Sequence, residues 1–249
     1  MKTKLLIITV VMAVLMASMS ADVRAYQDPS RQPAPEKPKQ APKTDSKQTS
    51  RPSPVIYKPP QLGAPGGRVG GGTRGIGGDT LSLVALAPNH VGLTTQPQPT
   101  FYWYLSGTPN FPLIFTLIEY KAVKPLVEKQ IAMPTRPGIH GISLQEFGVS
   151  LEPGTTYRWF VSIVPNQDSR AKDLVAGAMI ELTAPRDALN ARLRGAADRV
   201  EAAYVYAEEG IWYDAMMALS EAIDKNPGNA DLKQQRIDLL NQVGIDAVK

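Results

Sequence analysis

The sequence predicts an all-β sandwich domain followed by a small C-terminal α-helical segment. About seven short apolar or aromatic runs, separated by Pro, Gly, Asn or Asp, fill residues 81–183, a spacing typical of an antiparallel sandwich. From residue 184 onward the apolar residues recur every three or four positions, which indicates helices. The chain has no cysteine, so its stability must come from a hydrophobic core, and its hydrophobic content of 43% is that of a globular protein.

Residues 1–25 have the three parts of a secretory signal peptide. Lys2 and Lys4 supply positive charge, residues 5–17 form an apolar run, and Ala25 ends a stretch suited to cleavage. We therefore expect cleavage after Ala25 and export to the periplasm or the extracellular side. An uncleaved membrane anchor is the alternative, although the apolar run is short for a membrane span. No later segment is long and apolar enough to form a transmembrane helix.

A stretch rich in Pro, Lys, Gln and Ser, residues 26–62, follows the predicted cleavage site. It has too few apolar side chains to offset the entropy lost on folding, so we expect a disordered spacer. The net charge is +5 over residues 26–80, zero over 81–183 and −3 over 184–249. The basic character thus belongs to the N-terminal part of the chain, which together with export argues against a nucleic-acid partner.

Residues 63–80 form a glycine-rich stretch that raises the question of phosphate binding. Two of its glycines have the spacing of a P-loop, but Thr73 stands where the lysine should be, and a strand rather than a helix follows. Phosphate binding is therefore disfavoured. We expect a pliable lead-in to the sandwich, with Arg68 and Arg74 docking on the domain.

The strands predicted in the sandwich are short apolar or aromatic runs. They cover residues 81–87, 100–107, 112–120, 125–133, 138–144, 156–164 and 174–182. In the sixth run, Tyr157, Trp159, Val161 and Ile163 occupy alternate positions, so they share one face of the strand, which we expect to be buried.

The stretch LEPGTTY, residues 151–157, resembles the tyrosine corner of fibronectin type III-like and immunoglobulin-like sandwiches. The residues that carry this resemblance are Leu151, Pro153, Gly154 and Tyr157. It implies that the Tyr157 hydroxyl bonds to upstream backbone while the ring packs in the core. Its meaning is structural, so it does not mark a binding site.

Residues 184–249 are expected to form three helices. Thr183 suits the cap of the first helix, Gly210 ends it, Pro227 stops the second and Asn229 suits the cap of the third. Residues 203–240 also resemble a single tetratricopeptide repeat, at Tyr204, Gly210, Tyr213, Ala215, Leu219, Ala222, Ile223, Pro227 and Asn229. One repeat cannot bury its own apolar face, so we expect it to pack on the sandwich, as a structural cap in preference to a peptide site.

The order of these segments resembles the cyanobacterial domain-of-unknown-function 928 family. The stretches that carry the resemblance are GGRVGGGTRG, GLTTQPQPTFYWYL, PGIHGISL, SLEPGTTYRWFVSIV and AEEGIWYDAMMAL. Together they reach from about residue 63 to the C-terminus. The resemblance implies an exported protein of a photosynthetic bacterium, and it brings no known activity and no catalytic residue.

No residue pattern in the chain predicts catalysis, a cofactor or a metal site. His90 and His140 have no second histidine or carboxylate at metal-ligand spacing, and there is no nucleophile elbow. A glycosidase would need two facing carboxylates. The sandwich carboxylates mostly fall in turns or at strand ends: Glu119, Glu128, Glu146, Glu152, Asp168, Asp173 and Glu181. We expect a non-catalytic protein without a cofactor, with a carboxylate-dependent hydrolase as the lesser alternative.

The candidate interaction surface consists of Tyr102, Tyr104, Trp159 and Trp212. Alternate residues of a strand face opposite ways, so one pair of FYWY side chains can point outward and stack on a sugar ring or a partner. We predict an interaction or scaffold protein of the cell envelope, bound to an envelope protein. A glycan-binding module that uses outward aromatics to hold cell-wall glycan is the alternative. The sequence leaves the oligomeric state open.

Overall fold

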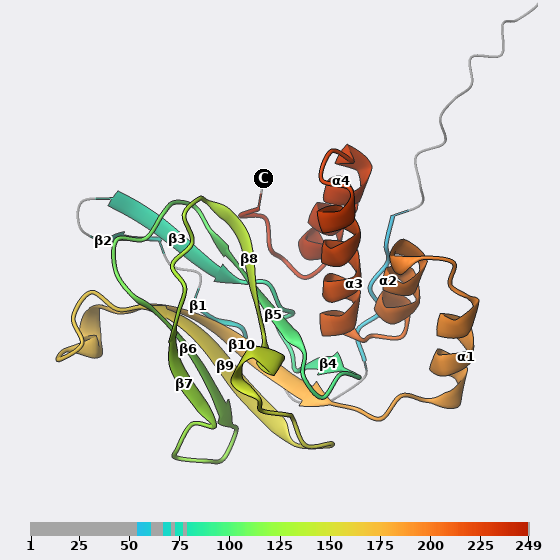
Figure 1. Ribbon diagram of the computed structural model, residues 1–249, viewed down its shortest axis with the longest axis horizontal. Coiled ribbons are helices and arrows are strands. Elements are labelled where there is room, and N and C mark those ends of the chain that lie inside the picture. Colours follow the sequence, from blue (N-terminus) through green and yellow to red (C-terminus); the bar gives the residue numbers. More distant parts are fainter. Residues whose placement is uncertain (1–53, 61–66, 71–72, 77–78, 249) are drawn as a thin grey trace, which may run out of the picture. The chain divides into compact units, whose positions relative to one another are not determined.

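The computed structural model describes residues 54–60, 67–70, 73–76 and 79–248, which belong to one unit, Ser50–Lys249. Two β-sheets form a sandwich, and helices follow at the C-terminal end of the chain (Figure 1). The predicted all-β sandwich with a C-terminal helical segment is confirmed. The predicted signal peptide and most of the predicted spacer lie outside the described residues.

The larger sheet has six strands. Its antiparallel body runs in the order β10 (Leu174–Leu182), β9 (Thr156–Ile163), β6 (Leu113–Glu119) and β7 (Val127–Ile131). Two short strands share the other side of β10, namely β1 (Val69–Gly70), which is antiparallel, and β4 (Gly92–Thr94), which is parallel. Strand β7 therefore forms an edge of this sheet.

The smaller sheet has four antiparallel strands, in the order β2 (Thr73–Ile76), β3 (Asp79–Ala85), β5 (Thr100–Leu105) and β8 (Gly138–Ser143). Strand β8 is an edge of this sheet. Two short 3-10 helices lie in connections, η1 (Leu144–Phe147) after β8 and η2 (Arg170–Lys172) between β9 and β10. Each of the seven predicted strands coincides with an observed one, and β1, β2 and β4 are additional short strands.

The glycine-rich lead-in is more ordered than predicted, because β1 and β2 both lie within it. Gly70 has a φ of +81°, and a Cβ at this position would lie 1.9 Å from the carbonyl oxygen of Val175. Glycine is therefore required where this segment runs against β10. The prediction for Arg68 is confirmed: its guanidinium donates to the carbonyl oxygens of Ala87 and Gly244, at 3.1 and 3.0 Å.

The sandwich core lies between the two sheets. Phe101 of β5 contacts Phe115 of β6 and Trp159 of β9, with ring centroids 5.2 and 5.1 Å apart. The predicted inward face of β9 is buried, and Tyr157 at its start is only 3% exposed. The tyrosine corner is present, since the backbone N–H of Glu152 donates to the Tyr157 hydroxyl at 3.1 Å.

Four helices follow the sandwich in the described chain, where three were predicted: α1 (Asp187–Gly195), α2 (Arg199–Glu208), α3 (Trp212–Lys225) and α4 (Ala230–Asn241). The single helix predicted to end at Gly210 is divided because Asp198 starts a new one. The Asp198 carboxylate accepts the backbone N–H groups of Val200 and Glu201, at 2.8 and 2.9 Å. Glu201 in turn accepts the N–H of Ala197, the residue before the cap, at 2.7 Å, which further fixes the start of the new helix.

The prediction that all of residues 26–62 form a disordered spacer is wrong for residues 54–60. This segment, the N-terminal strap, packs on the helices, with Val55 0% and Tyr57 7% exposed. Two apolar side chains at alternate positions are enough to attach it where a preformed apolar surface exists. None of the described helices has the length and apolar content needed to cross a bilayer.

Candidate functional site

The junction between helices and sandwich contains two of the four predicted surface residues. Trp159 donates its indole N–H to the hydroxyl of Tyr213 on α3, at 2.7 Å, and that hydroxyl donates to the Met179 carbonyl at 3.0 Å. Trp212 donates to the Leu86 carbonyl at 3.0 Å. Trp159 and Trp212 are both 0% exposed, so their assignment to an interaction surface is wrong. Their apolar area stabilises the joint core, and their N–H groups have buried partners.

Tyr102 and Tyr104 point away from the sandwich core, yet they do not form an open aromatic strip. Tyr102 is partly buried beneath the helices and hydrogen-bonds to Ser220 of α3, and its burial raises its pKa to about 12. Tyr104 is also partly buried against the core cluster. A platform for stacking sugar rings needs exposed ring faces, so this strand does not support the predicted glycan surface.

Asp214 in the first turn of α3 is the most unusual polar group of the junction, and sequence reasoning missed it. Its side chain is buried, with the residue 1% exposed. It accepts hydrogen bonds from the Thr94 hydroxyl at 2.5 Å, from the Thr95 backbone N–H at 2.9 Å and from the Thr95 hydroxyl. These bonds join α3 to the end of β4. An acid beside Trp212 and Tyr213, within an apolar stretch, was the available signal.

The N-terminal strap covers a second face of the helical segment. The Gln242 side chain accepts the Tyr57 backbone N–H at 2.9 Å and donates to the Val55 carbonyl at 2.8 Å. Tyr57 packs edge-on against Trp212, with ring centroids 5.0 Å apart. At Gly210, where φ is +76°, a Cβ would lie 2.8 Å from the Lys58 carbonyl oxygen. The chain itself therefore occupies the helical surface next to Trp212.

Replacing Gln242 with alanine is expected to increase the amide hydrogen-exchange rate of Tyr57 about tenfold, because both side-chain bonds to the strap are lost. Hydrogen–deuterium exchange read by mass spectrometry measures this change. Gln234→Ala, on the exposed side of α4, the helix that Gln242 caps, is the matched control and should leave the exchange rate of Tyr57 unchanged. Equal exchange rates in the two variants would mean that the Gln242 side chain does not hold the N-terminal strap on the helices.

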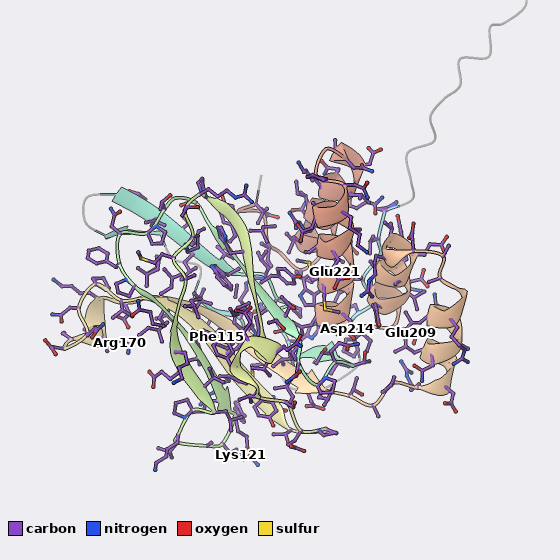
Figure 2. All side chains as sticks on the ribbon, viewed as in Figure 1. Phe115, Lys121, Arg170, Glu209, Asp214 and Glu221 are labelled. Carbon is purple, nitrogen blue, oxygen red and sulfur yellow. The ribbon has the colours of Figure 1, made fainter. Side chains whose placement is uncertain are left out.

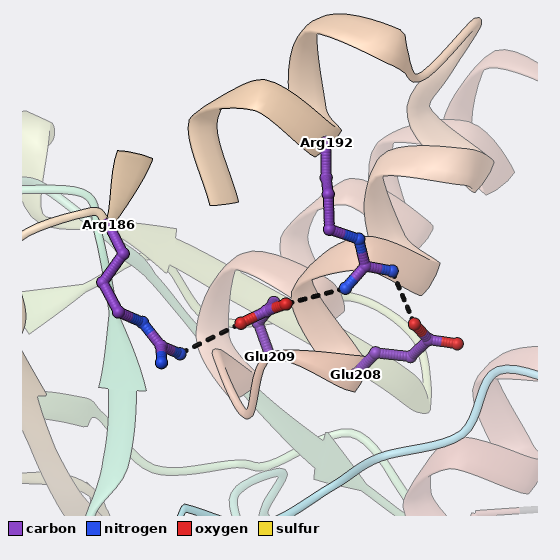
Figure 3. Close-up of polar contacts among 4 residues, drawn as sticks. All are labelled: Arg186, Arg192, Glu208 and Glu209. Carbon is purple, nitrogen blue, oxygen red and sulfur yellow. Dashed lines mark hydrogen bonds and ion pairs between the residues drawn. The ribbon is translucent and has the colours of Figure 1, made fainter. Parts of the chain in front are cut away.

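A charged network joins α1 to the end of α2 (Figure 3). Arg186 and Arg192 donate to Glu209 at 3.0 and 2.7 Å, and Arg192 also donates to Glu208 at 2.5 Å. Together with Glu181 these two glutamates line a cavity of about 490 Å³. Each glutamate of the pair is matched by a guanidinium, so the network has the character of a surface ion cluster and not of a catalytic acid pair.

A cavity of about 530 Å³ lies between the two edge strands, β7 and β8, and the loop that joins them. Its lining mixes aromatic and polar side chains, among them Trp103, Gln130, Thr135, Arg136, His140, Glu146 and Phe147. The Trp103 indole N–H is buried and has no hydrogen-bond partner among the described residues. Glu146 is the one carboxylate of the lining, and it accepts the Ser143 N–H at 3.2 Å in the cap of η1.

The two histidines lie in separate settings. His140 is in the lining of this cavity, where burial lowers its pKa and its Nε2 lies 3.0 Å from the Arg136 carbonyl. His90 lies beside the strap, with Nε2 3.3 Å from the Tyr57 hydroxyl. Within the described part of the chain, no three acidic or histidine side chains are placed to hold a metal ion.

The fold and its sites define a β-sandwich with a helical cap that shares its core and with a cavity at its open edge. The model of the family described as Domain of Unknown Function (DUF928) matches residues 69–249, and the chain belongs to that family. Among curated proteins no match to the chain is found. The family description names no catalytic activity.

Proposed function

We propose that the protein is an exported, non-catalytic interaction or scaffold protein of the cell envelope, whose partner binds at the open edge of the sandwich. The observation that carries this proposal is that both sheets end at the same cavity. Strands β7 and β8 each have one neighbour among the described strands, and both line the cavity between them. A partner segment in extended conformation gains backbone hydrogen bonds when it adds to such an edge.

The composition of the two edges favours β8 as the strand that pairs. Strand β7 carries Glu128 and Lys129, and charged side chains on an edge oppose strand addition. Strand β8 has the sequence GIHGIS, with no carboxylate, lysine or arginine. A partner strand would therefore extend the smaller sheet, and its side chains would reach the cavity.

The lining of the cavity supports binding rather than catalysis. The one carboxylate of the lining, Glu146, caps η1. The lining therefore offers no facing pair of carboxylates for glycoside hydrolysis. Cell-wall glycan is the second candidate partner, because the partly exposed ring of Phe147 stands beside the polar side chains of Gln130 and Arg136 in the same lining. Sugars are commonly held by such mixtures of apolar and hydrogen-bonding side chains.

The test is site-specific photo-cross-linking in the native envelope, with the photoreactive group placed at Thr135 in the cavity or at Lys233 on α4. We expect one envelope protein to be recovered from Thr135 and not from Lys233. Ile139→Lys, which places a charge on β8, should reduce the yield about tenfold. Gln234→Lys, which adds the same charge at an exposed position of α4 away from the cavity lining, is the matched control. Equal yields from both positions would refute the proposal, and recovery of wall glycan alone would support the second candidate.

A further inference from the structure

The hairpin tip, residues 120–126 between β6 and β7, concentrates exposed apolar side chains. Val123 is 93% exposed, and Tyr120 and Leu126 are each 51% exposed. These are three of the six large apolar residues that are exposed in the described chain. Single exposed apolar residues are ordinary, whereas three within one turn indicate a contact surface.

The tip is held in place, so this exposure is a property of the fold. The Tyr120 N–H donates to the Thr156 carbonyl at 2.9 Å, and the Leu126 N–H donates to the Leu117 carbonyl at 2.8 Å. The Arg158 guanidinium lies over the Tyr120 ring, 5.5 Å from its centroid. The apolar side chains are therefore presented by an ordered turn, at the end of the sheet where Lys121 is labelled (Figure 2).

The charge of the tip is positive. Lys121 and Lys124 alternate with the apolar residues, and the sequence YKAVKPL contains no acidic residue. The nearest acids along the sequence, Glu119 and Glu128, belong to the strands themselves, and Glu128 lies 3.9 Å from Arg170. Beyond the strand ends, the tip thus presents cations and apolar side chains together.

We propose that the hairpin tip docks the protein on an anionic lipid bilayer. Val123 and Leu126 insert between the headgroups and the acyl chains. Tyr120 lies at the membrane–water interface, where aromatic side chains are enriched. Lys121 and Lys124 contact the phosphate headgroups, where each cation adds to the attraction. A turn of seven residues is much shorter than the roughly 20–30 residues a side of a stable protein interface, which favours a lipid surface as the occupant. This site is separate from the cavity assigned to the envelope partner.

Vesicle co-sedimentation of the chain from Tyr26 onward tests the proposal, with vesicles of phosphatidylglycerol and phosphatidylcholine or of phosphatidylcholine alone. Binding is expected to require phosphatidylglycerol. Val123→Glu combined with Leu126→Glu should weaken partitioning at least about tenfold. Ile56→Glu combined with Val69→Glu, at residues 52% and 50% exposed outside the tip, adds the same two negative charges and is the matched control that should bind like the wild type.

The lysines are tested by Lys121→Glu with Lys124→Glu, against the control pair Lys225→Glu with Lys233→Glu on the helices. Both pairs change the net charge equally, so general attraction by the basic N-terminal region is the same in both. Only the tip pair is expected to lose about tenfold in partitioning. Thermal unfolding of all variants should coincide with that of the wild type, because every substituted residue is at least half exposed or on the surface.

Insertion has a direct readout in Val123→Trp. The native tryptophans Trp103, Trp159 and Trp212 are at most 2% exposed, so lipid-borne quenchers do not reach them. Brominated phosphatidylglycerol is expected to quench the introduced indole. Tip variants that bind vesicles like the wild type, an indole that stays unquenched, or binding of the tip to a protein without affinity for vesicles would each overturn the proposal.

Discussion

Asp214→Ala is expected to lower the free energy of unfolding by about 3 kcal/mol, the largest loss for any polar residue of the junction. The substitution leaves the buried Thr94 hydroxyl and the part-buried Thr95 N–H without their acceptor. It also detaches the start of α3 from β4. Urea unfolding at pH 6 measures the change.

Asp231→Ala is the matched control for this prediction, because Asp231 also lies in the first turn of its helix but is exposed. Its loss should be under about 1 kcal/mol, the size of a helix-dipole contribution. Similar losses in the two variants would mean that burial of Asp214 adds nothing to the stability of the fold.

The Asp214 contribution should also depend on pH. Burial raises the pKa of its carboxyl above the ordinary value, and the bonds from Thr94 and Thr95 oppose this shift without cancelling it. The folded state therefore binds this proton more tightly than the unfolded state does. The stability gained is complete below the unfolded pKa, about 4, and is lost as the pH rises through the folded pKa. The difference in unfolding free energy between wild type and Asp214→Ala should shrink over that range, and a difference that grows would contradict the raised pKa.

Tyr213→Phe is expected to lower the free energy of unfolding by about 2 kcal/mol. The ring is retained, but the Trp159 indole N–H loses its acceptor and the Met179 carbonyl loses its donor, both at the buried junction. Burial also raises the pKa of the Tyr213 hydroxyl, so it stays a neutral donor and acceptor. Chemical denaturation of the variant measures the loss.

Tyr120→Phe removes the same hydroxyl from a tyrosine that is 51% exposed, and it should change the unfolding free energy by less than about 0.5 kcal/mol. If Tyr213→Phe were equally harmless, the two hydrogen bonds that the Tyr213 hydroxyl makes with the sandwich would contribute nothing to the free energy of unfolding.

The helical segment and the sandwich share one core, as the Trp159–Tyr213 hydrogen bond illustrates. Trp159 belongs to the sandwich and Tyr213 to α3, and both are buried in the same core cluster. Deleting residues 184–249 would expose that core and remove the acceptor of the Trp159 N–H. Point substitutions at exposed positions therefore separate binding from folding, which a truncation cannot do.

Part of this protein follows from local sequence rules alone. The seven main strands and the tyrosine corner could be predicted because short apolar runs, turn residues and the LEPGTTY pattern act over a few neighbouring residues. The break between α1 and α2 was also present locally, as Asp198 followed by Glu201, although the apolar spacing that continues across it obscured the signal.

Tertiary structure determined which aromatic residues are exposed to solvent and which pack against each other. The alternation along β5 tells that Trp103 and Tyr102 face opposite ways, but it does not tell that α3 covers the face that carries Tyr102. The attachment of the strap, the burial of Asp214 and the cavity between β7 and β8 likewise depend on residues far apart in the chain. Tyr57 and Gln242, for example, become partners only when the helices are packed. The sequence determined the elements and their order through local interactions, and long-range packing alone determined the surfaces available for binding.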